Sequence, residues 1–191
     1  MKYFFLLAYL VIGKVSTSQE LPYKDGEIVY EITVVNRNLS KNDLFDNTLS
    51  FLDNTFNKKS VFIQSKDLNS GQILAIGLTD FKNKSKSRIK YDLGMIRRFR
   101  FKIDFKIDST SSTVSIYNID IVKAGNYGDV VSKLTDDAGN GKMVIENIKE
   151  GKVKTKEENL YKKKVDEVNE IFYTILALYK RAIEDSETDN N

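Results

Sequence analysis

The chain has 191 residues, of which 41% are hydrophobic and 30% are charged, and its formal net charge is +3. This length and composition suit one globular domain with short accessory segments. The chain contains no cysteine, histidine or tryptophan, which excludes disulfides, thiol nucleophiles, zinc–thiolate sites and histidine general bases.

Residues 1–18 have the layout of a cleavable secretory signal peptide. Lys2 precedes an apolar run that ends at Gly13, and small residues precede a cut after Ser18. The run is shorter than the roughly 20 residues that span a bilayer, and no cysteine follows it for lipid attachment. We therefore expect an exported protein, periplasmic or extracellular, that is not a lipoprotein and has no transmembrane span in its mature form.

The charge of the mature chain argues against a nucleic-acid partner. Removal of residues 1–18 takes away Lys2 and Lys14, so the 30 cations fall to 28 against 27 acids. A net charge of +1 is low for a protein whose function is to bind polyphosphate. The charge is unevenly spread, however, because residues 81–106 contain ten cations and two acids.

The first part of the mature chain predicts a strand and then a helix. Residues 27–35 alternate with the two-residue period of a strand that is buried mainly on one face. Ser40 is a good N-cap, and Asp43 stands in the position of a capping box. The apolar stripe that follows has helical spacing and predicts a helix over residues 41–56.

Four strands connected as hairpins are predicted next. They span residues 60–67, 72–80, 97–107 and 113–122. In the last strand the apolar phase shifts between Ile116 and Ile119, which predicts a one-residue bulge near Tyr117. Further along, DDAGNGK at 136–142 lacks the ligands of a calcium loop and the glycine of a phosphate loop, so we predict a turn.

A long helix is predicted over residues 155–184, because apolar residues repeat there at three- and four-residue steps. Its apolar centre is too short to span a membrane, so we expect the helix to lie across a sheet. Residues 185–191 are acidic and predict a disordered tail. Residues 19–184 then form a single α+β domain, an antiparallel five-stranded sheet with two helices on one face, in the order β-α-β-β-β-β-α.

Three segments resemble a family of exported bacterial domains. They are GEIVY at 26–30, LSK at 39–41 followed by Leu44, and SGQILAIG at 70–77. The resemblance covers residues 24–122 and implies a fold like that of the TATA-binding protein, with no assigned function and no catalytic residues. Fold alone does not carry function. A sheet that grips one long helix is also the plan of helix-grip domains, which we keep as the alternative architecture.

The segment RRFRFKIDFKID, residues 97–108, separates aromatic from cationic side chains by alternation. Successive strand side chains point to opposite faces, so the rings belong to the core and the charges to solvent. A single-stranded nucleic-acid platform needs both on one surface, which again argues against nucleic acid. The cations, with those of the preceding loop, form either a solvated face or a weak site for an anionic partner. They are Arg97, Arg98, Arg100, Lys102, Lys106, Lys82, Lys84 and Lys86.

These observations favour a protein that is not an enzyme and holds no cofactor or metal, since no pair of carboxylates is seen to converge. The first hypothesis is that the protein is an exported non-catalytic domain that serves as an interaction or structural module of the cell envelope. Its partner would be an anionic envelope component or another protein. The alternative is a carrier of small apolar, lipid-like ligands with a cavity between the C-terminal helix and the sheet. Such a cavity would be lined by Ala75, Gly77, Phe101, Phe172, Ile175 and Tyr179.

Overall fold

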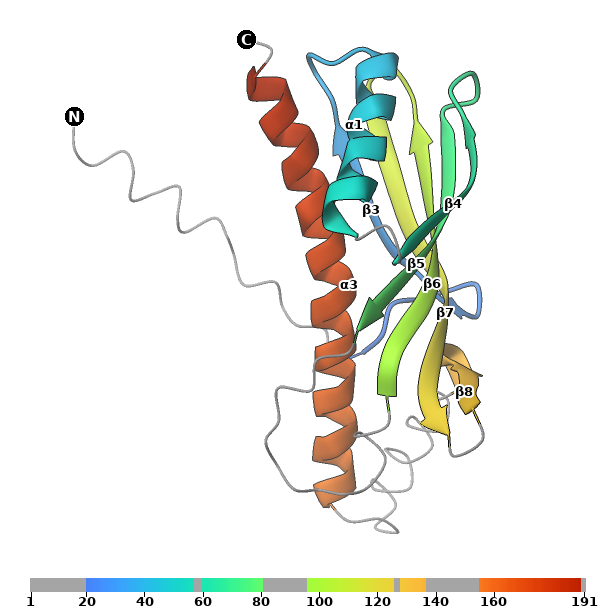
Figure 1. Ribbon diagram of the computed structural model, residues 1–191. Coiled ribbons are helices and arrows are strands. Elements are labelled where there is room, and N and C mark those ends of the chain that lie inside the picture. The colour runs from blue at the N-terminus through green and yellow to red at the C-terminus, as the bar shows by residue number, and fades with distance from the viewer. Residues whose placement is uncertain (1–19, 57–59, 81–95, 126–127, 137–154, 190–191) are drawn as a thin grey trace, which may run out of the picture.

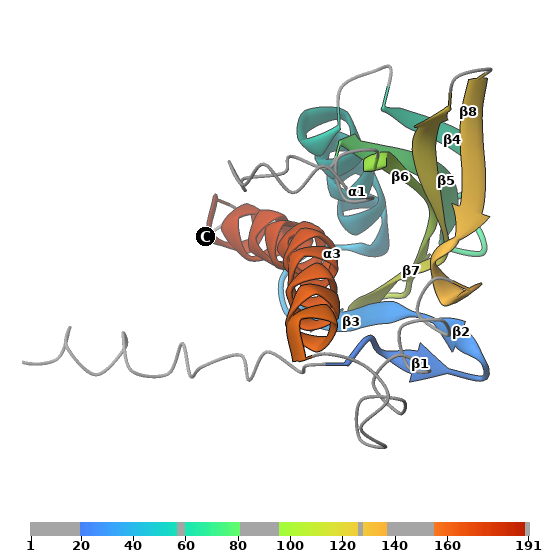
Figure 2. The ribbon, with the colours of Figure 1, turned by 90° about the horizontal axis from the view of Figure 1, so that it is seen from below.

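The fold is an antiparallel sheet with two helices on one of its faces (Figure 1, Figure 2). The computed structural model describes residues 20–56, 60–80, 96–125, 128–136 and 155–189. The elements are β1 (Tyr23–Lys24), β2 (Glu27–Ile28), β3 (Tyr30–Val35), α1 (Lys41–Thr55), β4 (Val61–Asp67), β5 (Gln72–Asp80), β6 (Ile96–Ile107), β7 (Ser111–Gly125), β8 (Gly128–Lys133) and α3 (Thr155–Asp189). The predicted α+β class is confirmed.

The main sheet contains six strands, whereas the sequence predicts five. Five of them follow the order β3-β7-β6-β5-β4, and all pairings are antiparallel. The sixth, β8, pairs with residues 120–125 of β7, beyond the part that pairs with β3. The segment GDVVSK has only two apolar residues, so its sequence shows no strand pattern. Strand β8 forms there because its backbone pairs with the long strand β7. The predicted strand 27–35 is divided, because β2 pairs with β1 in a separate hairpin.

Helix α1 begins at the predicted capping box. Ser40 Oγ accepts a hydrogen bond from the Asp43 N–H at 3.2 Å, and an Asp43 carboxylate oxygen accepts one from the Ser40 N–H at 3.2 Å. These bonds satisfy donors that a helix N-terminus would otherwise leave open. The helix packs against α3 and β6. Its buried residues are Leu44, Phe45, Thr48, Phe51 and Leu52.

Strand β6 separates its two kinds of side chain as predicted. Phe99, Phe101 and Phe105 are buried beneath the helices, whereas Arg98 and Arg100 are exposed. The predicted bulge is also present in the neighbouring strand. Lys102 pairs with Tyr117 and Arg100 with Asp120, so that two residues of β7 stand opposite Phe101 alone. One of these two, Asn118, has a positive φ of 50°, a conformation that asparagine tolerates better than most residues.

Helix α3 lies across the sheet and closes the core with aromatic contacts. The Phe172 ring centroid lies 5.7 Å from that of Phe99 and 5.3 Å from that of Phe101. About two helical turns further on, the Tyr179 ring centroid lies 5.1 Å from those of both Phe105 and Phe51. Such tilted and edge-on pairs are the preferred aromatic geometries. The helix therefore contacts the sheet and α1 at the same time.

The prediction of a disordered tail is wrong for residues 185–189, which continue α3 to Asp189. Ion pairs at i,i+4 spacing support this last part, among them Arg181 with Asp185 at 3.5 Å. In addition, Glu187 Oε1 accepts a hydrogen bond from the Arg37 N–H at 2.7 Å. A tertiary contact of this kind is not visible in the acidic composition from which the tail was predicted.

Candidate functional site

The outer face of the sheet, which points away from α1 and α3, carries the described members of the predicted cationic surface. On β6 the outer face consists of Arg98, Arg100, Lys102, Asp104 and Lys106. Lys102 is partly buried and the other three cations are exposed. The remaining predicted cations lie outside the described residues, as does the expected signal peptide at 1–18. They are Lys82, Lys84 and Lys86, together with the side chain of Arg97.

Acidic side chains break up the positive charge of the outer face. Arg100 donates two hydrogen bonds to Asp120 Oδ2, at 3.0 Å from Nε and 2.7 Å from the guanidinium Nη2. Glu31 accepts a hydrogen bond from Ser115 Oγ at 2.7 Å, which lowers the pKa of its carboxyl group. Burial instead raises the pKa of Asp104, despite the nearby Lys106. The surface is thus of mixed charge, with cations in excess along β6.

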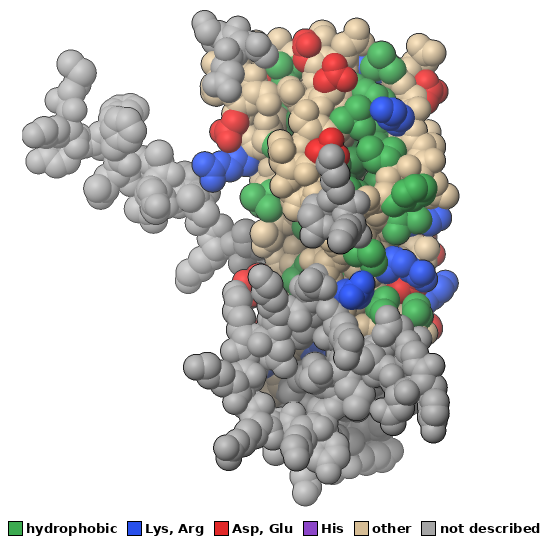
Figure 3. All heavy atoms as spheres, viewed as in Figure 1, with side chains coloured by type: hydrophobic (Ala, Val, Ile, Leu, Met, Phe, Trp, Pro, Cys, Tyr) green, Lys and Arg blue, Asp and Glu red, His purple; other side chains and the backbone are tan. Residues whose placement is uncertain are grey.

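Apolar side chains lie on the same outer face. Phe62 on β4 is 66% exposed and stands in one row with Ile76, Lys102 and Tyr117 across four strands. Val131 on β8 is 49% exposed. Figure 3 looks toward the helices and the β4 edge of the sheet, and it shows hydrophobic side chains on the side of the molecule where α1 and β4 lie. Aromatic residues and arginine are enriched in protein-binding surfaces.

The six residues predicted to line an apolar cavity form packed core instead. Ala75, Phe101, Phe172 and Tyr179 are at most 1% exposed. The space that Gly77 leaves by lacking a side chain is occupied by the Phe101 ring, which would lie 2.5 Å from an added Cβ. The interface between α3 and the sheet is therefore filled by side chains at these positions, and the cavity expected there is not formed.

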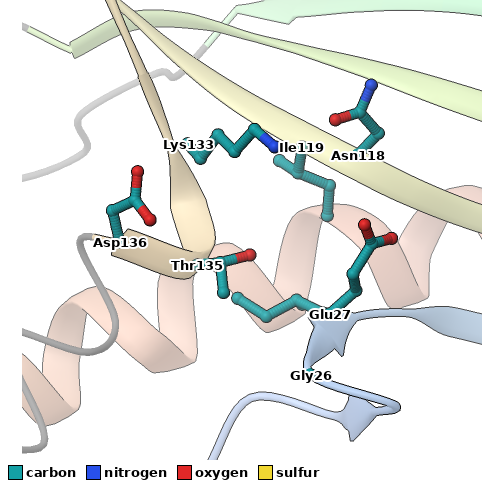
Figure 4. A pocket seen from close by; sticks show the side chains of 8 residues that line it. Gly26, Glu27, Asn118, Ile119, Lys133, Thr135 and Asp136 are labelled. Carbon is teal, nitrogen blue, oxygen red and sulfur yellow. The ribbon is translucent and has the colours of Figure 1, made fainter.

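A pocket of about 160 Å³ lies beside the bulge of β7 (Figure 4). Pairing of β7 with β3 ends at Ile116, and pairing with β8 begins at Asp120. Both strands use the same edge of β7, so the pocket occupies the gap between them, closed on one side by the β1–β2 hairpin. Its lining residues are Gly26, Glu27, Ile28, Asn118, Ile119, Lys133, Thr135 and Asp136.

The pocket combines an apolar floor with a polar rim. Ile28 and Ile119 are 2% and 4% exposed, respectively, and belong to the hydrophobic core. Lys133 and Thr135 reach toward the space from the β8 side, and Glu27 reaches toward it from the β2 side (Figure 4). The pocket can therefore present both signs of charge to a bound molecule.

The described residues contain no group of three or more acidic side chains that could hold a metal ion. Likewise, neither helix among them has the length and apolarity needed to cross a membrane. The pocket was not predicted from the sequence, because its residues come from three separate segments. The bulge near Tyr117 is predicted from the sequence, but nothing in the sequence shows that it lies beside the end of β8.

Two crystal structures are similar to this fold. A TBP-like protein from Parabacteroides distasonis has a TM-score of 0.52 and 15% identity, over 84% of this chain and 97% of that chain. A DUF4468 family protein from Bacteroides ovatus has a TM-score of 0.54 and 15% identity, over 83% of this chain and 90% of that chain. Likeness at this identity establishes the fold alone.

No curated protein matches the sequence. The family model described as a domain of unknown function (DUF4468) with TBP-like fold matches residues 24–121, which is more than half of the chain. The resemblance noted at 24–122 has nearly the same bounds. Together with the β-α-β sheet arrangement and the two helices on one face, this match shows that the chain belongs to the DUF4468 family of TBP-like domains.

Proposed function

We propose that the protein is an exported, non-catalytic binding module that docks an acidic partner of the cell envelope on the outer face of its sheet. The observation that carries the proposal is the 66% exposure of Phe62 in a row with Lys102, on a face that no described helix covers. Apolar side chains that are exposed together on one face of a protein mark sites where a partner binds.

The charge arrangement supports an acidic partner. Arg100 is already paired with Asp120, whereas no ion pair engages Arg98, Lys102 or Lys106 among the described residues. Exposed cations of this kind steer an oppositely charged partner and fix its orientation. The apolar side chains between them supply the contact area that excludes water.

Export is the second part of the proposal, and it is supported by the N-terminal pattern of charge, apolar run and small residues. A full-length chain expressed in a Gram-negative host should be recovered from the periplasmic fraction or the medium. Its N-terminus, read by mass spectrometry, should be Gln19. Recovery of an uncleaved chain from the cytoplasm would contradict export, but it would leave the proposal of a docking surface unaffected.

Co-purification tests the docking surface. The tagged full chain is crosslinked in cells of the source species, recovered from the envelope fraction and examined for bound proteins and lipids by mass spectrometry. The expected result is an acidic protein whose recovery falls at least tenfold in the triple variant Phe62→Ser, Arg98→Ser, Lys102→Ser. Recovery should also fall as salt rises from about 0.1 M to about 0.5 M, because salt screens exposed charges.

The matched control changes exposed cations on the opposite side, with Lys163→Ser and Arg181→Ser on α3. This control should retain the partner. Equal recovery with the outer-face variant and the control would contradict the proposal. Recovery of a stoichiometric lipid in place of a protein would also contradict the proposed docking of a protein, and it would favour the carrier hypothesis instead.

A further inference from the structure

We propose that the pocket beside the bulge of β7 binds a small zwitterion that carries one ammonium group and one carboxylate, of the size of a small amino acid. This site is independent of the docking surface proposed above. It lies at the edge of β7, in the gap between β3 and β8, whereas Phe62 lies on β4 and Arg98 on the outer face of β6.

The backbone is shaped specifically at this place. The bulge puts two residues of β7, Asn118 and Ile119, where one would continue the ladder, and Asn118 adopts φ +50°. Facing it, the β1–β2 hairpin turns through Asp25 and Gly26, whose φ angles are 53° and 82°. Bulges and left-handed residues are concentrated beside binding and catalytic sites, where they redirect side chains. The Asp25–Gly26 turn is the usual turn of a two-residue hairpin, so the uncommon backbone conformation at the pocket is that of Asn118 in the bulge.

The polar side chains of the rim are available to a ligand. Within the described residues, no ion pair and no side-chain hydrogen bond engages Glu27, Lys133 or Asp136. Asn118 and Thr135 likewise have no such partner among these residues. The Glu27 carboxylate and the Lys133 ammonium border the same pocket without pairing with each other (Figure 4). A ligand that carries both charges can pair with the two groups at once.

The arrangement assigns a position to each part of the ligand. The ligand's ammonium would lie toward Glu27, and its carboxylate toward Lys133 and Thr135. Its carbon atoms would rest on Ile28 and Ile119, which form the buried floor. A volume of about 160 Å³ suits a molecule of this size, since a cavity of about 150 Å³ holds one benzene molecule.

Other classes of ligand fit less well. An inorganic anion would meet the Glu27 and Asp136 carboxylates, and a divalent cation would meet the Lys133 ammonium. A purely apolar molecule would leave the rim groups desolvated without partners. Only a molecule with both charges satisfies the two sides of the pocket together.

The test compares three molecules of one shape by NMR titration of the mature chain. L-alanine carries both charges, lactate has a hydroxyl in place of the ammonium, and isopropylamine has a methyl in place of the carboxylate. We expect L-alanine to shift the amide signals of Asn118, Ile119 and Lys133, with an affinity at least tenfold higher than that of either analogue. Equal affinity for L-alanine and one analogue would contradict the zwitterion assignment.

Variants locate the site. Lys133→Met and Glu27→Gln each remove one charge from an exposed side chain, so the fold should be retained. Each variant should lower the affinity for L-alanine at least tenfold. Lys106→Met and Glu184→Gln are the matched controls at exposed positions away from the pocket and should leave the affinity unchanged. The absence of any shift at the pocket amides up to about 50 mM L-alanine, or equal weakening by the controls, would overturn the proposal.

Discussion

Gly77 shows how a single residue decides the packing beneath the long helix. An added Cβ would lie 2.5 Å from two ring carbons of Phe101, and that ring is held between Phe56 and Phe172 at centroid distances of 6.1 and 5.3 Å. The ring cannot move away without displacing its neighbours. We predict that Gly77→Ala lowers the free energy of unfolding by about 1–3 kcal/mol, the usual cost of overpacking, as measured by urea denaturation.

A second variant separates this clash from a general effect of alanine. Phe101→Leu frees space at the same point, so the double variant should lose less stability than the sum of the two single variants. The difference should be at least about 0.5 kcal/mol, as for residues in contact. Strict additivity would show that the Phe101 ring is not what excludes a side chain at Gly77.

The hydroxyl of Tyr179 joins α3 to the sheet and to α1 inside the core. It donates to Ser112 Oγ at 2.7 Å, and it lies 3.1 Å from Thr48 Oγ1. All three side chains are fully buried. We predict that Tyr179→Phe costs about 1–2 kcal/mol of the free energy of unfolding, because Ser112 then loses its donor in a place that water does not reach.

The accompanying measurement uses Ser112→Ala in the Tyr179→Phe background. Replacing both partners by apolar groups removes the unsatisfied hydroxyl, so this double variant should be no less stable than Tyr179→Phe alone. Thr48 keeps its own hydrogen bond to the Leu44 carbonyl at 2.7 Å in either case. A further loss of more than about 1 kcal/mol in the double variant would show that Ser112 has another role.

At the scale of the elements, the sequence predicts what depends on local chemistry and misses what depends on partners. The capping box of α1 and the alternation of β6 are local patterns, and the structure confirms both. The bulge of β7 follows from a phase shift within one strand. Strand β8 and the last turn of α3 have no such pattern, because pairing with β7 and the contact of Glu187 with Arg37 stabilise them.

The same distinction applies to the two candidate sites. The described cations of the outer face were predictable, because alternation along β6 alone directs them away from the core. The pairing of Arg100 with Asp120 was not, since that acid comes from the neighbouring strand β7. The pocket could not be predicted at all, because the β1–β2 hairpin and the end of β8 are about 100 residues apart in the chain.

The turn between β6 and β7 predicts a pH dependence of stability. Hydrogen bonds from the N–H groups of Thr110 and Ser111, at 2.8 and 2.7 Å, hold the pKa of Asp108 below its ordinary value of 3.8. A lowered folded-state pKa contributes stability that is present above pH 3.8 and is lost as the pH falls through the folded-state value. We predict that Asp108→Asn is less stable than the unsubstituted chain at neutral pH, and that the difference shrinks below pH 3.8.

Asp104 provides a control of the opposite sign. Burial raises the pKa of the Asp104 carboxyl group. The contribution of this group to stability is therefore present below pH 3.8 and is lost as the pH rises through the higher folded-state pKa. Asp104→Asn should therefore gain in stability relative to the unsubstituted chain as the pH rises from below 3.8 through that folded-state value. Urea denaturation at a series of pH values measures both variants, and parallel pH profiles for the two would contradict the assigned shifts.

At the scale of the whole molecule, the fold is larger than the region that the family model matches. The match ends at residue 121, before β8 and α3. The two similar crystal structures nevertheless cover 84% and 83% of the chain, well beyond that region. In this structure α3 supplies a large share of the core. Its buried apolar residues are Val165, Val168, Phe172, Ile175, Leu176, Tyr179 and Ile183.

We therefore predict that residues 24–121 alone do not fold. Burying each α3 side chain contributes about 1.5–3 kcal/mol, and the whole set rivals the 5–15 kcal/mol by which a domain is usually stable. Without α3 the rings of Phe99, Phe101 and Phe105 would face water.

The fragment 24–121 should show no cooperative unfolding transition, and its amide NMR signals should be poorly dispersed. Addition of the peptide 155–189 should restore part of the dispersion, whereas a chain of residues 20–188 should fold normally. A fragment 24–121 that unfolds cooperatively would mean that the sheet and α1 form a sufficient core, and that α3 is an accessory added to it.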